Sequence, residues 1–339
     1  MKKIIALTLL TILMLTVFTA CFPAGGSNDS PNAENVQQRT QIRVGYLTGP
    51  TGMGMAKMII DNNGLDGGNE NYTFTKYADT QAAKTDLASG KVDIICLPTN
   101  EAATDQEKVD NDAKILAINC LNSLFLISKS EGASLTSLSD YEGKTIYTCK
   151  NGTPRIVLEY ILNALSIDAN VSYTVDGKEM VTPADVSAQV LAGNIPNAVL
   201  PEPLISTAVI KTATNESGSY TKTIDLSTEW DKISNTPITM GCLVASGKFV
   251  KENKYSVDLF LEEYKKSVEF ISNPDNADSA ADYIQKTTII PALPIAKSAL
   301  LGLGGSIVYI DGKDMKDALI AFYNATNVAL PDESVYYEK

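Results

Sequence analysis

The segment Thr48-Gly49-Pro50-Thr51-Gly52 decides the fold, because it joins a strand-like run to an apolar run and has a counterpart later in the chain. Before it stands Ile42-Arg43-Val44-Gly45-Tyr46-Leu47, and after it an apolar-rich run extends from Met53 to Ile60. The counterpart consists of Thr145–Cys149, then Lys150-Asn151-Gly152-Thr153-Pro154, then Ile156–Leu165. Two such strand–turn–helix units predict two α/β lobes whose strand ends face each other across a cleft for a small molecule.

The elements expected from Gln41 onward alternate, which favours in each lobe a mostly parallel sheet flanked by helices. In the first unit we expect strands at Ile42–Leu47, Tyr72–Tyr77, Val92–Leu97, Ile115–Cys120 and Leu124–Ser128, and helices at Gly52–Asn63, Thr80–Ser89 and from Thr99. In the second unit we expect strands at Thr145–Cys149, Val171–Val175, Ala198–Leu200 and Pro237–Ser246, and helices at Thr153–Leu165, Pro183–Leu191 and Pro203–Lys211.

The tail from Phe249 is predicted to be helical. Apolar residues recur in it at three- and four-residue spacing, as on one face of an amphipathic helix: Val257, Phe260, Leu261, Tyr264, Val268 and Ile271. Because no further set of strands follows, we expect the tail to pack on the first lobe and the chain to cross between the lobes near 121–130 and 243–250. Lobe 1 would then comprise residues 41–123 plus 247–339, and lobe 2 residues 124–246.

The N-terminus predicts an exported, lipid-anchored protein. Lys2 and Lys3 precede the apolar run Ile4–Phe18, which is too short for a comfortable membrane span. Thr19-Ala20 before Cys21 resembles a bacterial lipoprotein signal, so residues 1–20 would be removed and a lipid would attach to the sulfur of Cys21. Residues 21–40 have the composition of a flexible tether that holds the body to the outer face of the cell membrane. An ordinary secretory signal and an uncleaved anchor are the alternatives.

Composition excludes several classes of function. The net charge of −12 becomes −14 once Lys2 and Lys3 leave with the signal, which argues against nucleic acid as a partner. The sequence holds no His, which removes Ser-His-Asp and Cys-His catalysis and every His-ligated metal site. We expect no metal and no cofactor.

The cysteines of the body lack metal-ligand spacing. Cys96, Cys120 and Cys242 lie in strand-like apolar runs, which is typical of buried thiols. A Cys96–Cys120 disulfide is the alternative in an exported protein, and the sequence leaves it open.

The two glycine-containing turns are candidates for the binding site, because helix N-termini behind such turns present unpaired N–H groups and a positive dipole end. Glu202 lies between Pro201 and Pro203, which fix its backbone. Its carboxylate would accept hydrogen bonds from a ligand amine or ring N–H, or would cap the helix that follows. Trp230, in the polar Thr228-Glu229-Trp230-Asp231, would be an exposed lid over the cleft or a contact between domains.

The arginine content bears on the ligand. Only Arg39, Arg43 and Arg155 are present, and only Arg155 lies near the expected cleft. Multiply charged anions usually bind guanidinium groups, whereas one Arg together with helix N-termini could still hold a monoanion. Together with Glu202, this favours a neutral or cationic solute that is flat and contains nitrogen.

Five motifs carry a family resemblance when they are taken in order: Gly45-Tyr46-Leu47 with Gly49-Pro50-Thr51-Gly52, Leu87–Asp93, Gly143-Lys144-Thr145, Asn151-Gly152-Thr153-Pro154 and Leu200-Pro201-Glu202-Pro203. They resemble the substrate-binding lipoproteins of bacterial ABC importers, in the branch for nitrate, sulfonates, taurine and thiamine precursors. The resemblance implies a two-lobed type II periplasmic-binding-protein fold that closes on one solute and delivers it to a permease and its ATPase.

The resemblance also implies the contacting positions, namely Tyr46, Thr51, Gly52, Thr99, Asn100, Gly152, Thr153 and Glu202. We expect a monomer. A ligand-sensing partner of a membrane receptor is the alternative function. An enzyme on the same fold is disfavoured, because the enzymatic branches rely on an active-site His or a Cys-rich run and work in the cytoplasm.

Overall fold

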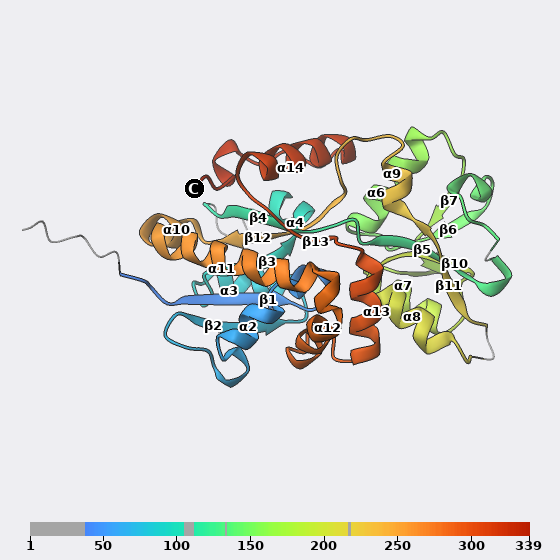
Figure 1. The fold of residues 1–339 in the computed structure, drawn as a ribbon. Coiled ribbons are helices and arrows are strands. Elements are labelled where there is room, and N and C mark those ends of the chain that lie inside the picture. The colour runs from blue at the N-terminus through green and yellow to red at the C-terminus, as the bar shows by residue number, and fades with distance from the viewer. Residues whose placement is uncertain (1–37, 105–111, 133, 216–217) are drawn as a thin grey trace, which may run out of the picture. The chain divides into compact units, whose positions relative to one another are not determined.

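A six-stranded sheet in the order β13-β4-β12-β3-β1-β2 organises the first part of the fold in the computed structural model (Figure 1). The structure describes residues 38–104, 112–132, 134–215 and 218–339, and the chain from Arg39 to Lys339 forms one unit. The predicted signal at 1–20, the lipid site at Cys21 and the tether up to residue 37 lie outside the described residues.

The six-stranded sheet combines parallel and antiparallel pairs. Its strands are β1 (Ile42–Leu47), β2 (Tyr72–Tyr77), β3 (Ile94–Pro98), β4 (Lys114–Leu121), β12 (Thr239–Ala245) and β13 (Ile307–Ile310). β1 pairs parallel with β2 and β3, whereas β12 pairs antiparallel with β3 and β4, and β13 antiparallel with β4. The helices between these strands are α1 (Pro50–Met53), α2 (Ala56–Asp61), α3 (Thr80–Ala88) and α4 (Thr99–Thr104). The single helix expected at Gly52–Asn63 is thus two short ones.

A three-stranded sheet, β10-β5-β11, forms the second part, and both of its pairs are antiparallel. Its strands are β5 (Leu124–Lys129), β10 (Asn197–Pro201) and β11 (Tyr220–Asp225). Among the described residues of this part, the parallel pairing that we expected is found only between β6 (Thr145–Tyr147) and β7 (Asn170–Ser172). The reason is topological: β5 leads the chain away from the first sheet and β11 leads it back, so these two neighbours run in opposite directions.

Further elements complete the second part. They are a hairpin of β8 (Thr174–Val175) and β9 (Lys178–Glu179), and the helices α6 (Thr153–Ala164), α7 (Pro183–Leu191), α8 (Leu204–Thr212) and α9 (Leu226–Trp230). The Asn197 side chain joins β10 to β6, because Nδ2 donates to the Thr145 carbonyl over 3.0 Å and Oδ1 accepts from the Tyr147 amide over 3.3 Å. α7 has the bounds that the sequence predicted.

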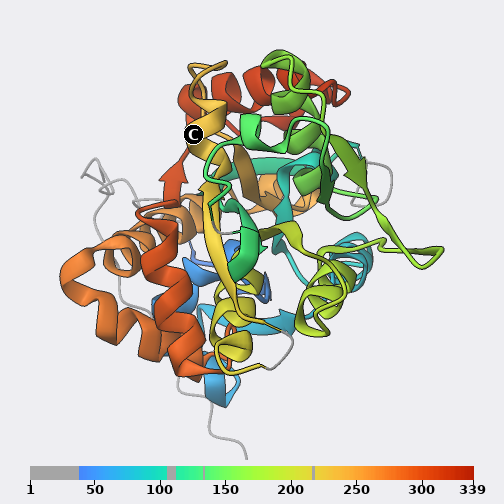
Figure 2. The same cartoon turned by 90° about the vertical axis from the view of Figure 1, so that its right-hand side faces the viewer.

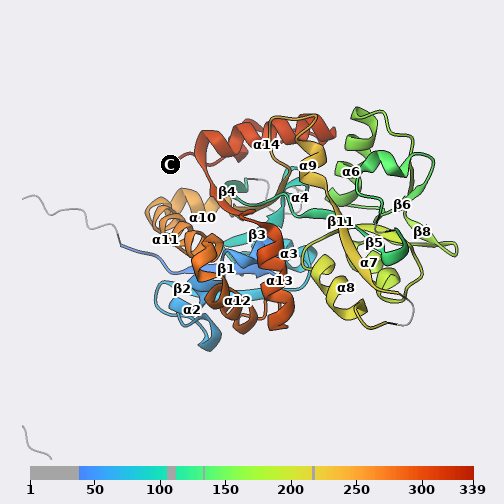
Figure 3. The ribbon, with the colours of Figure 1, turned by 45° about the vertical axis from the view of Figure 1, so that its right-hand side comes forward.

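The tail helices are α10 (Gly247–Glu252), α11 (Lys254–Ser272), α12 (Ala277–Lys286), α13 (Leu293–Leu303) and α14 (Gly312–Thr326). The predicted apolar face of α11 is buried, and this helix packs against α2 and β13. α13 also contacts α8, and α14 contacts α6, so the tail touches both parts (Figure 3). Figure 2 looks from the side of the second part, with the orange and red tail helices at the left and top.

The chain crosses twice between the two parts, from β4 into β5 and from β11 through α9 into β12. β12 lies in the six-stranded sheet, whereas the expected boundary assigned residues 239–245 to lobe 2. The residue bounds of the lobes stay a prediction, and this pairing favours a second crossing before Thr239. Asn122 joins the two crossings. Its backbone N–H donates to the Ile238 carbonyl over 3.0 Å, and its side-chain Oδ1 accepts from the backbone N–H of Ile238 over 3.0 Å.

Trp230 is fully buried, so the expectation of an exposed side chain is wrong. Its ring packs between Tyr160 of α6, at 5.0 Å, and Phe322 of α14, at 5.8 Å, and its Nε1 donates to the Thr236 carbonyl over 2.5 Å. The polar residues beside it in sequence hid the fact that α9 turns the indole inward. Trp230 therefore joins the second part to the tail, and it does not line a cleft.

Cys96, Cys120 and Cys242 are free and buried, which confirms the prediction of core thiols and leaves the Cys96–Cys120 disulfide unformed. Cys149 is also free and buried. Burial raises the pKa of Cys96 and of Cys120 to about 12, so both stay protonated. Among the described helices, none combines the length and the apolar character that crossing a bilayer requires.

The Asn122–Ile238 contact predicts a stability effect. Asn122→Ala removes the side-chain oxygen Oδ1 and leaves the backbone N–H of the buried Ile238 without its hydrogen-bond acceptor. This should lower the free energy of unfolding by about 1–3 kcal/mol. Urea unfolding followed by Trp230 fluorescence measures it. Asn327→Ala is the matched control, because Asn327 also has a positive φ (58° against 42°) but is exposed at the end of α14. Equal effects of the two substitutions would contradict a special role for Asn122.

Candidate functional site

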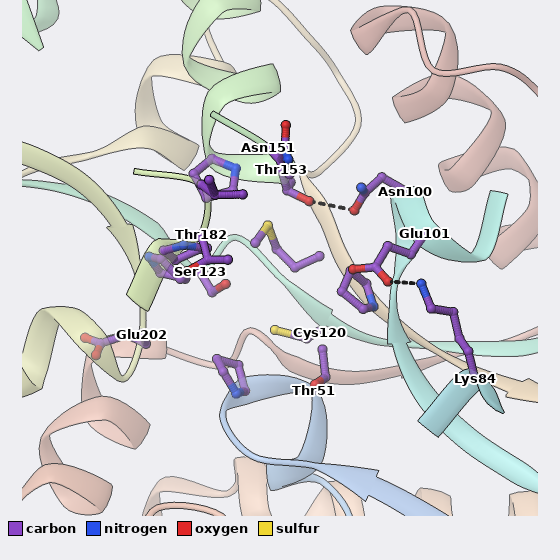
Figure 4. A pocket seen from close by; sticks show the side chains of 18 residues that line it. Thr51, Lys84, Asn100, Glu101, Cys120, Ser123, Asn151, Thr153, Thr182 and Glu202 are labelled. Carbon is purple, nitrogen blue, oxygen red and sulfur yellow. Dashed lines mark hydrogen bonds and ion pairs between the residues drawn. The ribbon is translucent and has the colours of Figure 1, made fainter. Parts of the chain in front are cut away.

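A cavity of about 500 Å³ lies between segments of the two parts (Figure 4). Small-molecule sites in proteins have volumes of this order. Both parts contribute to its wall. The first part contributes Pro50, Thr51, Lys84, Pro98, Asn100, Glu101, Cys120 and Met240. The second part and the crossings contribute Ser123, Asn151–Pro154, Val181, Thr182, Pro183, Pro201 and Glu202. The wall therefore matches the cleft that the two glycine-containing turns predicted.

The N-terminus of α6 opens onto this cavity. Gly152 is its N-cap residue, has a φ of 97° and leaves the helix without a side-chain cap, and Pro154 occupies the first turn. The positive φ explains why glycine stands there, since other residues rarely adopt this conformation. The first N–H groups of a helix lack partners within the helix. Those of α6 are thus available to an acceptor group in the cavity.

A hydrogen bond crosses the cavity between the two parts. The hydroxyl of Thr153 on α6 donates to Oδ1 of Asn100 on α4 over 3.0 Å, and Figure 4 shows the two side chains pointing toward each other. Thr153 is almost fully buried. This bond uses the acceptor of the Asn100 amide and leaves its two N–H donors, so Asn100 can donate to a solute while it holds α6 in place.

Five of the eight predicted positions line the cavity, and three do not. The five are Thr51, Asn100, Gly152, Thr153 and Glu202. Tyr46 is buried and its hydroxyl donates to the Thr287 carbonyl over 3.3 Å, and burial raises the pKa of this phenol. A Cβ on Gly52 would lie 1.9 Å from the Leu47 carbonyl oxygen, so glycine is required there by packing. Thr99 donates to the Thr239 carbonyl over 2.7 Å. These three support the wall and do not face the cavity.

A family model described as NMT1/THI5 like matches residues 73–277, more than half of the chain. The chain belongs to the NMT1/THI5-like family. This confirms the family group that the motifs indicated. Comparison with curated protein sequences gives no match.

Solved structures share the fold of this NMT1/THI5-like protein. An ABC transporter protein from Parabacteroides distasonis is 21% identical, with a TM-score of 0.68 over 88% of this chain and 99% of that one. The periplasmic aliphatic sulphonate binding protein SsuA from Escherichia coli is 14% identical, with a TM-score of 0.65 over 89% and 93%. The periplasmic nitrate-binding protein NrtA from Synechocystis is 13% identical, with a TM-score of 0.55 over 81% and 74%. The two-lobed α/β fold class is thereby confirmed.

Glu202 of this NMT1/THI5-like protein is turned away from the cavity, although it forms part of the wall. Its Oε2 accepts from the Ser206 amide over 3.1 Å, which caps α8, and a Cβ on Gly302 of α13 would lie 2.7 Å from Oε1. Figure 4 shows the carboxylate directed away from Thr51 and Asn100. Burial raises the pKa of Glu202, against the opposing effects of Ser206 and Lys222. The geometry thus favours the capping role over the ligand contact.

Sequence reasoning missed the ion pair in the wall. Nζ of Lys84, on α3, lies 2.7 Å from Oε2 of Glu101, in the first turn of α4, and only 4% of the Lys84 side chain is exposed. No local pattern predicts this pair, because it depends on how α3 packs beside α4. Thr182 was also missed, although its Thr-Pro-Ala-Asp sequence is the signature of a capping box, which the structure contains. In the described ranges, no cluster of His, Cys, Asp or Glu could hold a metal ion.

The buried charge of Glu202 predicts a pH effect on stability. Glu202→Gln keeps an acceptor for the Ser206 amide and removes the charge. Because the pKa is raised above its usual 4.5 in the fold, the wild-type carboxyl stabilises the protein at lower pH and loses this contribution as pH rises through the folded pKa. The variant should therefore gain stability relative to wild type as pH rises from 4.5 toward 7. Urea unfolding at several pH values measures this, and a difference that stays constant or falls would contradict it.

Proposed function

We propose that this protein is the solute-binding component of an ABC importer, which captures a small organic solute between two lobes and presents it to a membrane permease and its ATPase. The observation that carries the proposal is the cavity of about 500 Å³ walled from both parts, with the Thr153–Asn100 bond across it. The fold shared with proteins named for import or for sulphonate and nitrate binding supports it.

The contacts that we propose are Thr51, Asn100, Gly152 and Thr153, all of them predicted from the sequence. Asn100 would donate from its amide, and the first N–H groups of α6 would receive an acceptor group of the solute. Tyr46, Gly52, Thr99 and Glu202 are left out, because the first three lie behind the wall and Glu202 caps α8. A binding role without catalysis is supported by the absence of His from the whole sequence.

We further propose that the mature protein is a monomer on the outer face of the cell membrane, attached through a lipid on Cys21. The support is the basic start, the short apolar run and the Thr19-Ala20-Cys21 junction. Residues 22–37 would then let the body reach a permease in the same membrane.

Native mass spectrometry of the protein purified from its own organism tests the binding role. We expect one small organic molecule bound per chain, released on denaturation. A chain that carries no solute, and gains none from the growth medium, would contradict the proposal.

The turn at Gly152 predicts a loss of binding with little loss of fold. Gly152→Ala forces a side chain into a left-handed conformation at the edge of the cavity and shifts the first N–H groups of α6, so affinity for the co-purified solute should fall about tenfold or more. Isothermal titration with that solute measures it. Gly177→Ala is the matched control, because Gly177 also has a positive φ, with open space around its Cβ position, and lies in the β8–β9 turn outside the cavity wall. Equal losses would place the effect in backbone strain alone.

The lipid anchor predicts a change of fractionation. Cys21→Ser removes the sulfur that would carry the lipid, so the protein should move from the membrane fraction to the soluble exported fraction. Immunoblotting of fractionated cells reads this out. A variant that stays in the membrane would instead indicate an uncleaved apolar anchor.

A further inference from the structure

Glu101 directs one carboxylate oxygen into the cavity. Its Oε2 accepts from Nζ of Lys84 over 2.7 Å, and Figure 4 shows the other oxygen, Oε1, on the cavity side of the carboxylate. Among the described residues, Lys84 is the hydrogen-bond partner of this carboxylate, so Oε1 is available. About a quarter of the side chain, 26%, is exposed, in contrast to 4% for Lys84. Both residues line the cavity, and the carboxylate is the more exposed of the two groups.

The charges around the cavity are unfavourable for an oxyanion at this end. None of the described residues that line it is an arginine. Arg39, Arg43 and Arg155 pair instead with Glu263, Asp93 and Glu159. The Lys84 charge is balanced by Glu101, and the second carboxylate of the wall, Glu202, is turned toward α8 and α13. An anion placed against Oε1 would meet a like charge, and a hydrogen-bond donor would meet a free acceptor.

A carboxylate in an enclosed cavity requires hydrogen-bond donors for both of its oxygens. Burying a charge without partners is costly, and a charge-assisted hydrogen bond is roughly twice as strong as a neutral one. Lys84 holds Oε2 in place and thereby fixes the direction in which Oε1 points. A solute group that donates N–H to Oε1 completes the hydrogen bonding of this carboxylate, and a group without a donor leaves it incomplete.

We propose that Glu101 determines the specificity of the cavity, by selecting a solute whose nitrogen donates a hydrogen bond to Oε1: an amine, an amidine or an amino-substituted heterocycle. Lys84 is a positioning residue in this arrangement. The inference rests on the solute-binding function proposed above, and it replaces Glu202 by Glu101 as the carboxylate that recognises the solute.

The test uses the full chain and the low-molecular-weight fraction of yeast extract as the probe. Wild type and three variants are incubated with the extract and passed through a desalting column, and the retained solutes are released and identified by mass spectrometry. Glu101→Gln removes the charge of Oε1 and keeps its size. The double variant Lys84→Met with Glu101→Gln avoids a lysine without its Glu101 partner and decides the test if the single variant does not fold.

The third variant, Glu229→Gln, is the matched control, because Glu229 is also a buried carboxylate paired with a lysine, Lys232, at 2.6 Å, and it lies outside the cavity wall. We expect wild type and this control to retain a solute with an N–H-donating nitrogen. Both Glu101 variants should retain at least tenfold less of it while keeping the far-ultraviolet dichroism of the fold.

Other outcomes overturn the proposal in distinguishable ways. A retained solute without such a nitrogen, or one retained equally by both Glu101 variants, would overturn the role of Glu101 and leave solute binding intact. Recovery of retention in the double variant would show that the changed surroundings of Lys84, and not the lost carboxylate, caused the loss. Retention of nothing by wild type would overturn the solute-binding function itself.

Discussion

The pair of hydrogen bonds between Asn122 and Ile238 is the contact on which the arrangement of the two parts depends. β4 passes into β5 at Asn122, and the returning chain reaches β12 just after Ile238, so these bonds tie both crossings at one point. Every other contact between the six-stranded and three-stranded sheets must be compatible with this point. The cavity lies beside it, since Cys120, Ser123 and Met240 line the wall next to the two crossings.

Other contacts between the parts, at a distance from these crossings, are of a kind that could break if the two parts moved apart. The Thr153–Asn100 bond joins a hydroxyl group to an amide oxygen over 3.0 Å, and the Ser206–Ser298 bond joins two hydroxyl groups over 2.9 Å. Trp230 packs against Tyr160 and Phe322 on helices from different parts of the chain. Hinge closure around a ligand usually depends on a few loop or element-terminal residues that absorb the change in backbone angles.

The sequence predicted those elements and site residues that are determined by neighbouring residues in the chain. The alternation of apolar runs and glycine-ended helices predicted α7 with its observed bounds, and it placed Gly152 and Thr153 at the cavity. β11 was missed, because its Thr221, Lys222 and Thr223 have no apolar run, and its place is set by pairing with β5. The Lys84–Glu101 pair and the direction of Glu202 depend on neighbouring helices, which no single-sequence pattern encodes. Trp230 was misjudged for the same reason.

The cavity combines hydrogen-bond donors with an acceptor. The N-terminus of α6 and the Asn100 amide supply N–H groups, and Glu101 supplies a carboxylate oxygen held by Lys84. A solute with both an acceptor and a nitrogen donor would satisfy both.

A crystal structure of the protein with its co-purified solute tests the central claim most directly. The account predicts solute density in the cavity between α4 and α6, with Asn100 on one side and Gly152 on the other. Density at any other place on the chain, with this cavity filled by water alone, would contradict it.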